Sequence, residues 1–221
     1  MKIYYESFSE CGPRKNNEDY ISIREMPEQD RAVFVLCDGM GGHLNGEVAS
    51  KLVAEHLCDY WVKNPKRKDS AKKVMDACDE TMIAFNSKSN VEMGTTMAMV
   101  AIEGKKALLA HCGDSRIYVV HDGKIIYQSK DHVSFAPEGW PVISRAFFTA
   151  RNNYKPDIKE LDLQVGDLIL ICSDGVYGNQ KDEEIDDLLD SEEPFDIEDI
   201  YSIALFRCTD NISAILIKIK G

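Results

Sequence analysis

The sequence predicts an α+β fold in which antiparallel strands are covered by helices. Short apolar segments with the length and residue types of strands recur along the chain, at residues 3–8, 20–23, 32–37, 96–102, 106–112, 116–120, 125–128, 168–172 and 212–219. Glu103-Gly104-Lys105 and Asp122-Gly123 separate such segments and have the composition of hairpin turns, which join antiparallel strands. The predicted helices fall in separate blocks of the sequence, which favours an α+β sandwich over a parallel, doubly wound sheet.

The helices are predicted from apolar residues that recur at three and four positions. The first covers residues 46–62, with an apolar stripe formed by Val48, Ala49, Leu52, Val53, Leu57, Tyr60 and Trp61. The second covers residues 70–85, with a stripe formed by Ala71, Val74, Met75, Cys78, Met82 and Phe85. A third helix is predicted at residues 197–206, and the acidic stretch at 182–193 reads as solvated helix faces and loops. We expect the two long helices to cover a sheet face.

The composition is that of a globular protein and argues against several classes of partner. The 221 residues, 44% of them hydrophobic and 29% charged, suit one domain spanning residues 1–221. The net charge of −12, from 38 acidic and 26 basic residues, leaves no basic surface that could neutralise a nucleic-acid backbone. We therefore expect no nucleic-acid partner.

The cysteines and the hydropathy of the chain indicate the compartment. The seven cysteines include no Cys-x-x-Cys pair, and several lie inside apolar runs, as buried free thiols do in a reducing environment. The N-terminus has no signal-peptide pattern, and no later segment has the length of a membrane span. We expect a cytoplasmic protein with no membrane partner.

Four aspartates lie next to apolar strands in a way that suggests a shared site. Asp38, Asp114 and Asp174 come directly after predicted strands and beside glycines, and Asp210 immediately precedes the last strand. In an antiparallel sheet, the end of one strand lies beside the start of its neighbour, so these carboxylates can converge on one rim. Each Asp-Gly pair taken alone is also a common turn signal, and Asp122-Gly123 reads as a turn only.

Converging carboxylates repel one another unless cations or protons neutralise them. All the candidate ligands are oxygens, and no Cys/His cluster has zinc spacing, so the expected ions are Mg²⁺ or Mn²⁺. Two such ions that share a carboxylate can activate a hydroxide for attack on phosphorus. The sequence thus favours a metal-dependent phosphohydrolase.

A polar segment near the N-terminus adds a candidate phosphate ligand. In it Arg14 lies four residues before the acidic pair Glu18-Asp19. The guanidinium group has the planar fork that binds phosphate oxygens, and the two carboxylates could serve a second metal ion directly or through water. The alternative interpretation is an ordinary polar loop.

Taken together, these segments resemble the metal-dependent protein phosphatases, also called type 2C protein serine/threonine phosphatases, in the bacterial-type branch. The resemblance spans nearly the whole chain. It is carried, in the order of the family, by Arg14-x-x-Asn17-Glu18-Asp19, Asp38-Gly39-Met40-Gly41-Gly42-His43, Gly46-Glu47, Ala49-Ser50, Gly94-Thr95-Thr96, Gly113-Asp114-Ser115-Arg116, Asp131-His132, Ser144-Arg145-Ala146, Ser173-Asp174-Gly175 and Asp210-Asn211.

The resemblance implies a four-layer αββα sandwich, in which two antiparallel sheets are flanked by helices, with two core metal ions in a cleft at one end. It also implies roles for individual residues. Asp38 would bridge both ions, the Gly39 carbonyl would contact one of them, and Asp174 and Asp210 would complete the first site. Glu18 and Asp19 would serve the second site, Asp114 with Asp174 a weaker third site, and Arg14 would bind the substrate phosphate.

The chain departs from the family pattern at two places. Met40 stands where eukaryotic members carry a histidine proposed as the general acid, and His43 is either a helper or an ordinary loop histidine. The stretch from Asp131 to Asp174, which contributes a flap beside the cleft in the family, is short for a bacterial-type member. Its remnant is expected at Glu138-Gly139-Trp140-Pro141.

The predicted function is hydrolysis of phosphoserine and phosphothreonine in proteins by a metal-bridging water or hydroxide, in a monomer whose substrates come from a Ser/Thr kinase. No cysteine has an arginine six residues later, so a cysteine-dependent phosphatase is not expected. The alternative is a catalytically inactive relative that binds phosphoproteins as a regulatory module.

Overall fold

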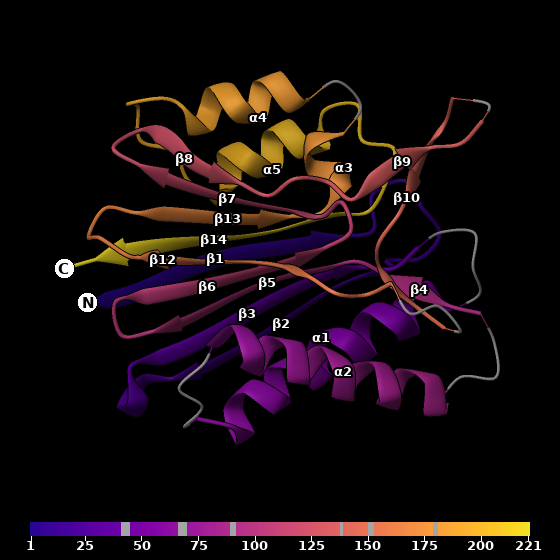
Figure 1. The fold of residues 1–221 in the computed structure, drawn as a ribbon. Coiled ribbons are helices and arrows are strands. Elements are labelled where there is room, and N and C mark those ends of the chain that lie inside the picture. The colour runs from indigo at the N-terminus through magenta and orange to yellow at the C-terminus, as the bar shows by residue number, and fades with distance from the viewer. Residues whose placement is uncertain (41–44, 66–69, 89–91, 138, 150–152, 179–180) are drawn as a thin grey trace.

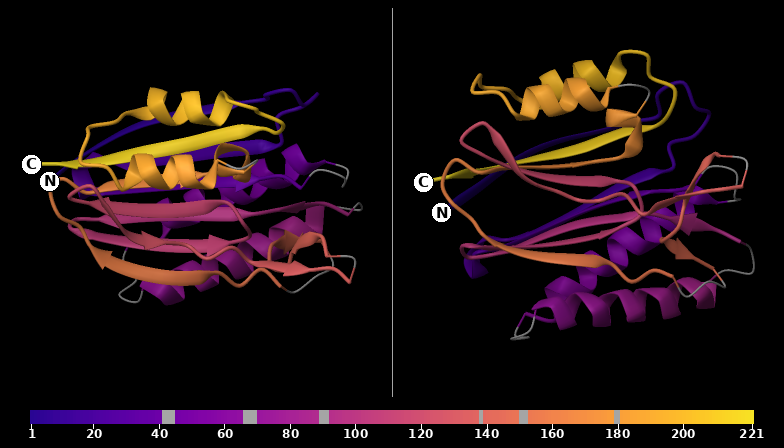
Figure 2. Two further views of the ribbon diagram at one scale, coloured as in Figure 1. Left: turned by 90° about the horizontal axis from the view of Figure 1, so that it is seen from above. Right: turned by 45° about the horizontal axis from the view of Figure 1, so that its top comes forward.

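The computed structural model describes residues 1–221 apart from 41–44, 66–69, 89–91, 138, 150–152 and 179–180. It contains two five-stranded antiparallel sheets that face each other, with helices on both outer sides (Figure 1). The right-hand view in Figure 2 shows the same layers from another direction. The predicted αββα sandwich is therefore confirmed, and so are the hairpin turns at residues 103–105 and 122–123.

The first sheet contains both ends of the chain. Its strands, in spatial order, are β1 (Lys2–Glu10), β14 (Ile212–Lys220), β13 (Leu168–Cys172), β7 (Arg116–His121) and β8 (Lys124–Gln128). The helices that cover its outer side are α3 (Asp174–Tyr177), α4 (Asp182–Leu189) and α5 (Ile197–Leu205). Because β1 pairs along its whole length with β14, Glu10 lies opposite Ile212. The segments that follow β1 and precede β14 are thereby brought together.

The second sheet carries the two long helices. Its strands are β12 (Asp157–Asp162), β6 (Lys106–Cys112), β5 (Met97–Glu103), β3 (Arg31–Asp38) and β2 (Asp19–Met26). Its outer side is covered by α1 (Gly46–Lys63) and α2 (Ser70–Lys88). The remaining elements are η1 (Pro27–Gln29), the paired short strands β4 (Gly94–Thr95) and β11 (Phe147–Phe148), and the hairpin of β9 (Val133–Phe135) and β10 (Pro141–Ile143).

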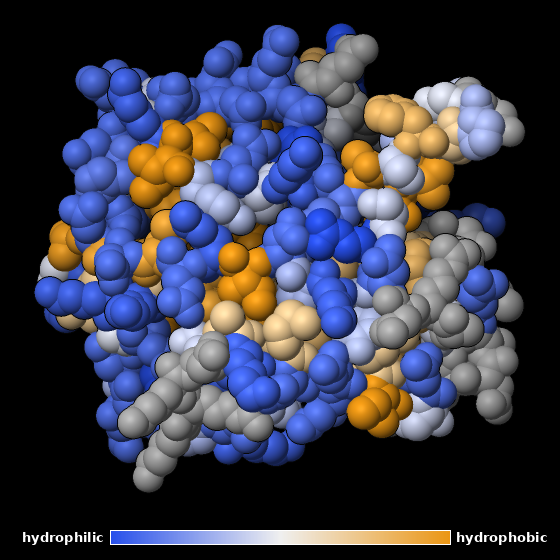
Figure 3. All heavy atoms as spheres, viewed as in Figure 1, coloured by the Kyte–Doolittle hydropathy of each residue, from blue (hydrophilic) through white to orange (hydrophobic). Residues whose placement is uncertain are grey.

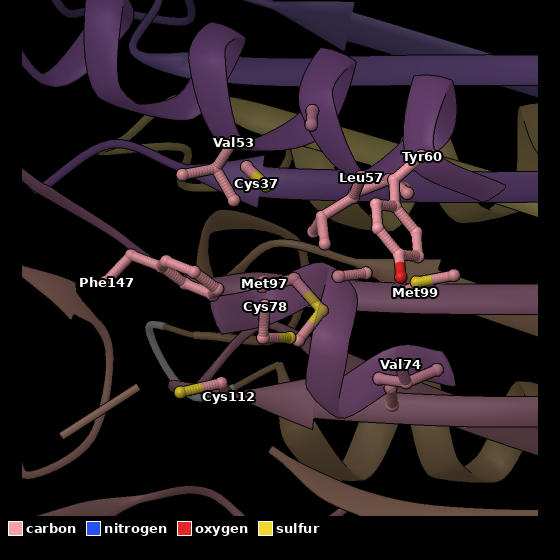
Figure 4. Packing of buried hydrophobic residues seen from close by; sticks show 14 of the residues in the cluster. Cys37, Val53, Leu57, Tyr60, Val74, Cys78, Met97, Met99, Cys112 and Phe147 are labelled. Carbon is pink, nitrogen blue, oxygen red and sulfur yellow. The ribbon is translucent and has the colours of Figure 1, made fainter. Parts of the chain in front are cut away.

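Three main clusters of buried side chains hold the sandwich together. Between the sheets, apolar residues of both, such as Phe34, Val100 and Ile171, form a continuous cluster. A second cluster lies under α1 and α2, where Leu57 packs beside the methionines of β5 (Figure 4). A third lies under the helices of the first sheet. Strands β3 and β5 are buried on both faces, which explains why their sequences are continuously apolar and do not alternate.

Some expectations need correction. Val48, placed on the apolar stripe of the first helix, is 46% exposed. Strand β12 was not predicted, because only Ile158 and Leu161 of this edge strand are partly buried and its remaining positions are charged and exposed. The acidic stretch at 182–193 contains helix α4 followed by a loop, as expected, and the buried residues of this helix are Ile185 and Leu189. Among the described residues, no helix has both the length and the apolar character needed to cross a membrane.

Candidate active site

Most of the predicted site residues line one cleft. The strands and loops that carry them end on the side of the sandwich opposite both chain termini (Figure 1). The cleft has a volume of about 730 Å³. Of the residues proposed from sequence, those that line it are Arg14, Glu18, Asp38, Gly39, Asp114, Asp174 and Asp210. Asp38 ends β3, Asp114 follows β6, Asp174 opens α3 two residues after the end of β13, and Asp210 precedes β14. The expected convergence of strand-end aspartates on one rim is therefore confirmed.

The backbone of Asp38 is held by the Gly94-Thr95-Thr96 segment. The Thr95 hydroxyl donates to the Asp38 carbonyl oxygen at 2.8 Å, and the Thr96 amide donates to the same oxygen at 2.9 Å. The Asp38 amide in turn donates to Thr96 Oγ1 at 2.9 Å. A side chain at Gly39 would lie 2.4 Å from the Gly46 carbonyl oxygen, so only glycine allows the chain to pass here.

Asn211 joins the N-terminal loop to the last strand. Its side-chain amide donates to the carbonyl oxygens of Cys11 at 2.8 Å and Asn16 at 2.9 Å, and its Oδ1 accepts from the Glu18 amide at 2.9 Å. The side chain is buried, and three of its hydrogen-bonding positions are used by backbone groups that are otherwise far away in sequence. Asn211 thus fixes the loop that carries Arg14 and Glu18.

Replacement of Asn211 by alanine is expected to destabilise the protein by about 2–4 kcal/mol, because three hydrogen bonds to buried or half-buried backbone groups are lost together. The measurement is chemical denaturation with and without metal. As a control, Asn64→Ala removes a single side-chain hydrogen bond, which Asn64 Nδ2 donates to the Tyr60 carbonyl oxygen at the end of α1. This variant should lose far less stability. Equal losses in the two variants would contradict the role assigned to Asn211.

Arg14 and Asp210 form an ion pair across the cleft mouth. Arg14 Nη2 lies 2.5 Å from Asp210 Oδ2, and Arg14 Nε donates to the Thr209 carbonyl oxygen at 3.0 Å. About half of the Arg14 side chain is exposed to solvent. The guanidinium group therefore stands at the entrance with its charge partly neutralised by a neighbouring carboxylate.

Asp19 lies behind the cleft and does not line it. It is directly opposite Asp38 in the β2–β3 pairing, and its Oδ2 accepts from the Ser173 hydroxyl at 2.8 Å. Its other carboxylate oxygen, Oδ1, is buried and has no hydrogen-bond partner in the described part of the chain. An unpartnered buried carboxylate oxygen is costly, so this atom needs a proton, a water molecule or a cation.

The electrostatics of the cleft favour uptake of positive charge. Burial raises the pKa of Asp19 to about 7, and the charges of Asp174 and Asp210 contribute to this rise. Burial and the charge of Asp174 raise the pKa of Asp114 to about 7. Burial and the neighbouring carboxylates Asp19 and Asp174 raise the pKa of Asp38 well above its usual value. These directions share one cause, since several carboxylates lie in a place with little solvent.

The donor set fits a hard divalent cation. It consists of carboxylate and backbone carbonyl oxygens, with an orphaned buried oxygen on Asp19 and mutual repulsion for an ion to relieve. Among the described residues, no group of three or more acidic, histidine or cysteine side chains is placed so that it could hold a metal ion by itself. Mg²⁺ and Mn²⁺ match the oxygen donors, and Mg²⁺ commonly takes only one or two carboxylates directly and keeps several water ligands.

Asp114 is positioned by an aromatic and ionic network that sequence reasoning did not identify. The Tyr177 hydroxyl donates to the Asp114 carbonyl oxygen at 2.6 Å, and the Arg116 guanidinium stacks on the Tyr177 ring at 3.6 Å. Arg116 also forms a two-point ion pair with Asp131, at 3.0 and 2.9 Å. These groups hold the turn after β6 against α3.

Sequence reasoning grouped Asn211 with Asp210 and Ser173 with Asp174 but assigned neither a role. Their position next to the aspartates was a usable signal, whereas Tyr177 gave none, because its partner is a backbone oxygen 63 residues away. Met40 lines the cleft and is largely buried, packed near Ala146 and Phe148. His43 lies outside the described residues.

Comparison with known proteins identifies the family of this chain. The model of the protein phosphatase 2C family matches residues 13–208. Protein phosphatase PhpP of Streptococcus pneumoniae is 28% identical over 82% of this chain and 81% of its own length. The serine/threonine protein phosphatase PstP of Mycobacterium tuberculosis is 32% identical over 84% of this chain and 38% of its own length.

Solved structures are similar over the whole fold. The serine/threonine phosphatase Stp1 from Staphylococcus aureus has a TM-score of 0.82 at 28% identity, covering 100% of this chain and 96% of that one. The catalytic domain of PstP, in a crystal structure with two manganese ions, has a TM-score of 0.77 at 27% identity and covers 99% of each chain. The chain therefore belongs to the protein phosphatase 2C family of serine/threonine phosphatases.

Proposed function

We propose that this chain hydrolyses phosphoserine and phosphothreonine in proteins with the help of two Mg²⁺ or Mn²⁺ ions held in the acidic cleft. The observation that carries the proposal is the convergence of Asp38, Asp174 and Asp210 with Arg14 in one cleft. A dense set of carboxylates next to an arginine suits a site that binds cations and a phosphate group together.

The proposed ligand set uses the cleft residues. Asp38 would be shared by both core ions, and the Gly39 carbonyl would contact one of them. Asp174 and Asp210 would complete the first site. Glu18 and Asp19 would serve the second site, directly or through water, and Asp114 with Asp174 a weaker third one. When bound, the ions would neutralise the carboxylates and lower the pKa of water so that hydroxide can attack phosphorus.

The chain's own contribution to phosphate binding comes from Arg14. Its guanidinium can donate two parallel hydrogen bonds to phosphate oxygens. In the structure the same group pairs with Asp210. Met40, on the cleft wall, has no ionisable proton, so the proton for the leaving serine or threonine oxygen comes from another source.

The test is hydrolysis of p-nitrophenyl phosphate and of a phosphothreonine peptide with added Mn²⁺. Turnover that depends on Mn²⁺ and is abolished by EDTA is expected. The alternative, an inactive relative that binds phosphoproteins, predicts Mn²⁺ uptake by calorimetry and peptide binding without turnover.

Arg14→Ala is expected to raise KM for a phosphothreonine peptide by about 10- to 100-fold with a smaller effect on kcat, because a charge-assisted hydrogen bond to the substrate is lost in both ground and transition states. Steady-state kinetics at saturating Mn²⁺ measures it. The matched control is Arg24→Ala, since Arg24 is a partly exposed arginine on β2 paired with Asp59 at 3.7 Å. An unchanged KM in the Arg14 variant would remove the phosphate-binding role.

We also propose that residues 1–221 form one catalytic domain that acts as a monomer in the cytoplasm. The pairing of β1 with β14 supports the first part, because it joins the two ends of the chain in one sheet. The substrates of such an enzyme must be made by a Ser/Thr kinase.

A further inference from the structure

The hairpin formed by β9 and β10 carries a concentration of exposed apolar side chains. Of the twelve large hydrophobic residues that are exposed in the described part of the chain, four belong to it: Val133, Phe135, Trp140 and Val142. Phe135 is 74% exposed and Trp140 72%. In Figure 3 the hairpin projects at the upper right, and hydrophobic residues gather along it and at its base. Contiguous exposed apolar surface of this kind marks interaction sites.

The base of the hairpin is fixed to the acidic cleft. The Ser144 amide donates to the His132 carbonyl oxygen at 2.7 Å, and the Gly113 amide donates to His132 Nδ1 at 3.1 Å. His132 Nε2 lies 3.0 Å from Asp157 Oδ2, which Arg145 also contacts at 3.3 Å. The hairpin is thereby tied to the segment that carries Asp114, and its strands extend from the cleft with a defined orientation.

The apolar surface of the hairpin continues into the cleft. Pro141, Val142 and Ile143 of β10 line the cleft, and Phe135 lies directly opposite Pro141 in the hairpin, so the two share a face. Ile143 packs on the small cluster of Met40, Ala146 and Phe148, and two of these residues also line the cleft. We define the apolar track as the cleft-lining residues Met40, Phe148, Ile143, Val142 and Pro141, together with Trp140, which precedes Pro141 in the chain, is 72% exposed and does not itself line the cleft. Arg14, Lys15 and Asn16 also line the cleft.

We propose that the apolar track binds the stretch of the phosphoprotein next to the phosphorylated residue, and that it selects substrates with an aromatic or branched aliphatic side chain within a few residues of the phosphate. This inference rests on the proposed function. The cleft volume of about 730 Å³ is well beyond the needs of one phosphorylated side chain and lies in the range of pockets that enclose larger ligands. The substrate is the occupant because the track begins at the catalytic carboxylates, where another protein would block the phosphate site.

Two sets of phosphothreonine peptides test this specificity. Within each set the peptides differ at one position next to the phosphothreonine, which is leucine, phenylalanine or serine. This position comes before the phosphothreonine in one set and after it in the other. The unaltered protein is expected to show a kcat/KM at least about tenfold higher for the apolar peptide in one set. Trp140→Ser and Val142→Ser should lower that preference to near unity through KM, and Trp140→Phe should restore most of it.

The controls separate this inference from the proposed function. p-Nitrophenyl phosphate has no flanking residue, so its hydrolysis should change less than about twofold in Trp140→Ser, whose substituted side chain does not line the cleft. Ile83→Ser, which removes a side chain that is 71% exposed on α2, should leave both substrates and the preference unchanged. If the protein hydrolyses neither substrate with Mn²⁺, the proposed function is wrong.

Other outcomes overturn the inference alone. Equal kcat/KM for apolar and polar peptides in an otherwise active enzyme removes the selective role of the track. Loss of p-nitrophenyl phosphate hydrolysis in Trp140→Ser shows that the hairpin acts on the catalytic residues. A dimer in sedimentation experiments that dissociates on Trp140→Ser shows that a second copy covers the surface.

Discussion

Replacement of Asp38 by asparagine is expected to lower kcat by more than about 100-fold and at the same time to stabilise the metal-free protein. The substitution keeps the size of the side chain, and the backbone bonds from Thr95 and Thr96 to this residue do not depend on its carboxylate. The loss of activity would therefore come from the missing negative charge of the carboxylate that both proposed core ions bind. Steady-state kinetics over a Mn²⁺ titration measures this part of the prediction.

The gain in stability has a separate physical cause. Asp38 has a pKa raised by burial and by Asp19 and Asp174, so its ionised form is disfavoured in the folded protein without metal. Replacing this carboxylate by a neutral amide should raise the free energy of unfolding in EDTA at neutral pH, because asparagine has no ionised form that burial and the neighbouring carboxylates disfavour. Thermal melts in EDTA and in Mn²⁺ measure it, and with Mn²⁺ the order of stability should reverse.

The matched control is Asp122→Asn, which makes the same change in another Asp-Gly pair. Asp122 lies in the β7–β8 turn with its side chain 88% exposed, and asparagine tolerates its left-handed backbone. This variant should keep its activity and its metal-free stability. An Asp38→Asn protein that melts below the parent in EDTA would show that repulsion among the cleft carboxylates does not control the stability of the metal-free protein.

The metal-free protein is expected to lose stability as the pH rises from about 6.5 to about 8. The pKa values of Asp19 and Asp114 are raised to about 7, so the folded state holds protons that the unfolded state has already released. When the folded state binds more protons, stability falls with rising pH, by at most about 1.4 kcal/mol per pH unit for each such group. The measurement is denaturation in EDTA at several pH values.

The pH window is chosen because other groups act outside it. Burial lowers the pKa of His111 to about 4 and also lowers that of His132, so these histidines oppose the trend at pH values below the window. Burial raises the pKa of Cys78 and of Cys112, which adds a further loss of stability above the window. Within the window the carboxylates dominate.

Metal and mutation should both remove this pH dependence. With Mn²⁺ present, stability should stay level or rise across the same window, because the ions bind deprotonated carboxylates. Asp114→Asn should make the slope in EDTA shallower, whereas Asp122→Asn should leave it unchanged. Stability in EDTA that is constant across the window would contradict the raised pKa values.

Much of this protein could be predicted from its sequence, for reasons that individual elements illustrate. Strands such as β6 and β13 had their predicted bounds, because continuous apolar runs between turn residues report burial directly. The convergence of the aspartates followed from their position at strand ends in an antiparallel arrangement. Strand β12 and the contacts of Tyr177 were not predictable, since the first is a half-exposed edge strand and the second contacts a distant backbone oxygen.

The sequence by itself determined the layer architecture, the acidic rim and the chemistry of its ligands, because these depend on residue type and on local periodicity. Only the tertiary structure decided that Asp19 lies buried behind Asp38, that Arg14 pairs with Asp210, and that the hairpin continues one wall of the cleft. Those features arise where segments far apart in the chain meet. The interaction energies of these features depend on distances and on burial in the folded chain, which a local pattern of residues does not specify.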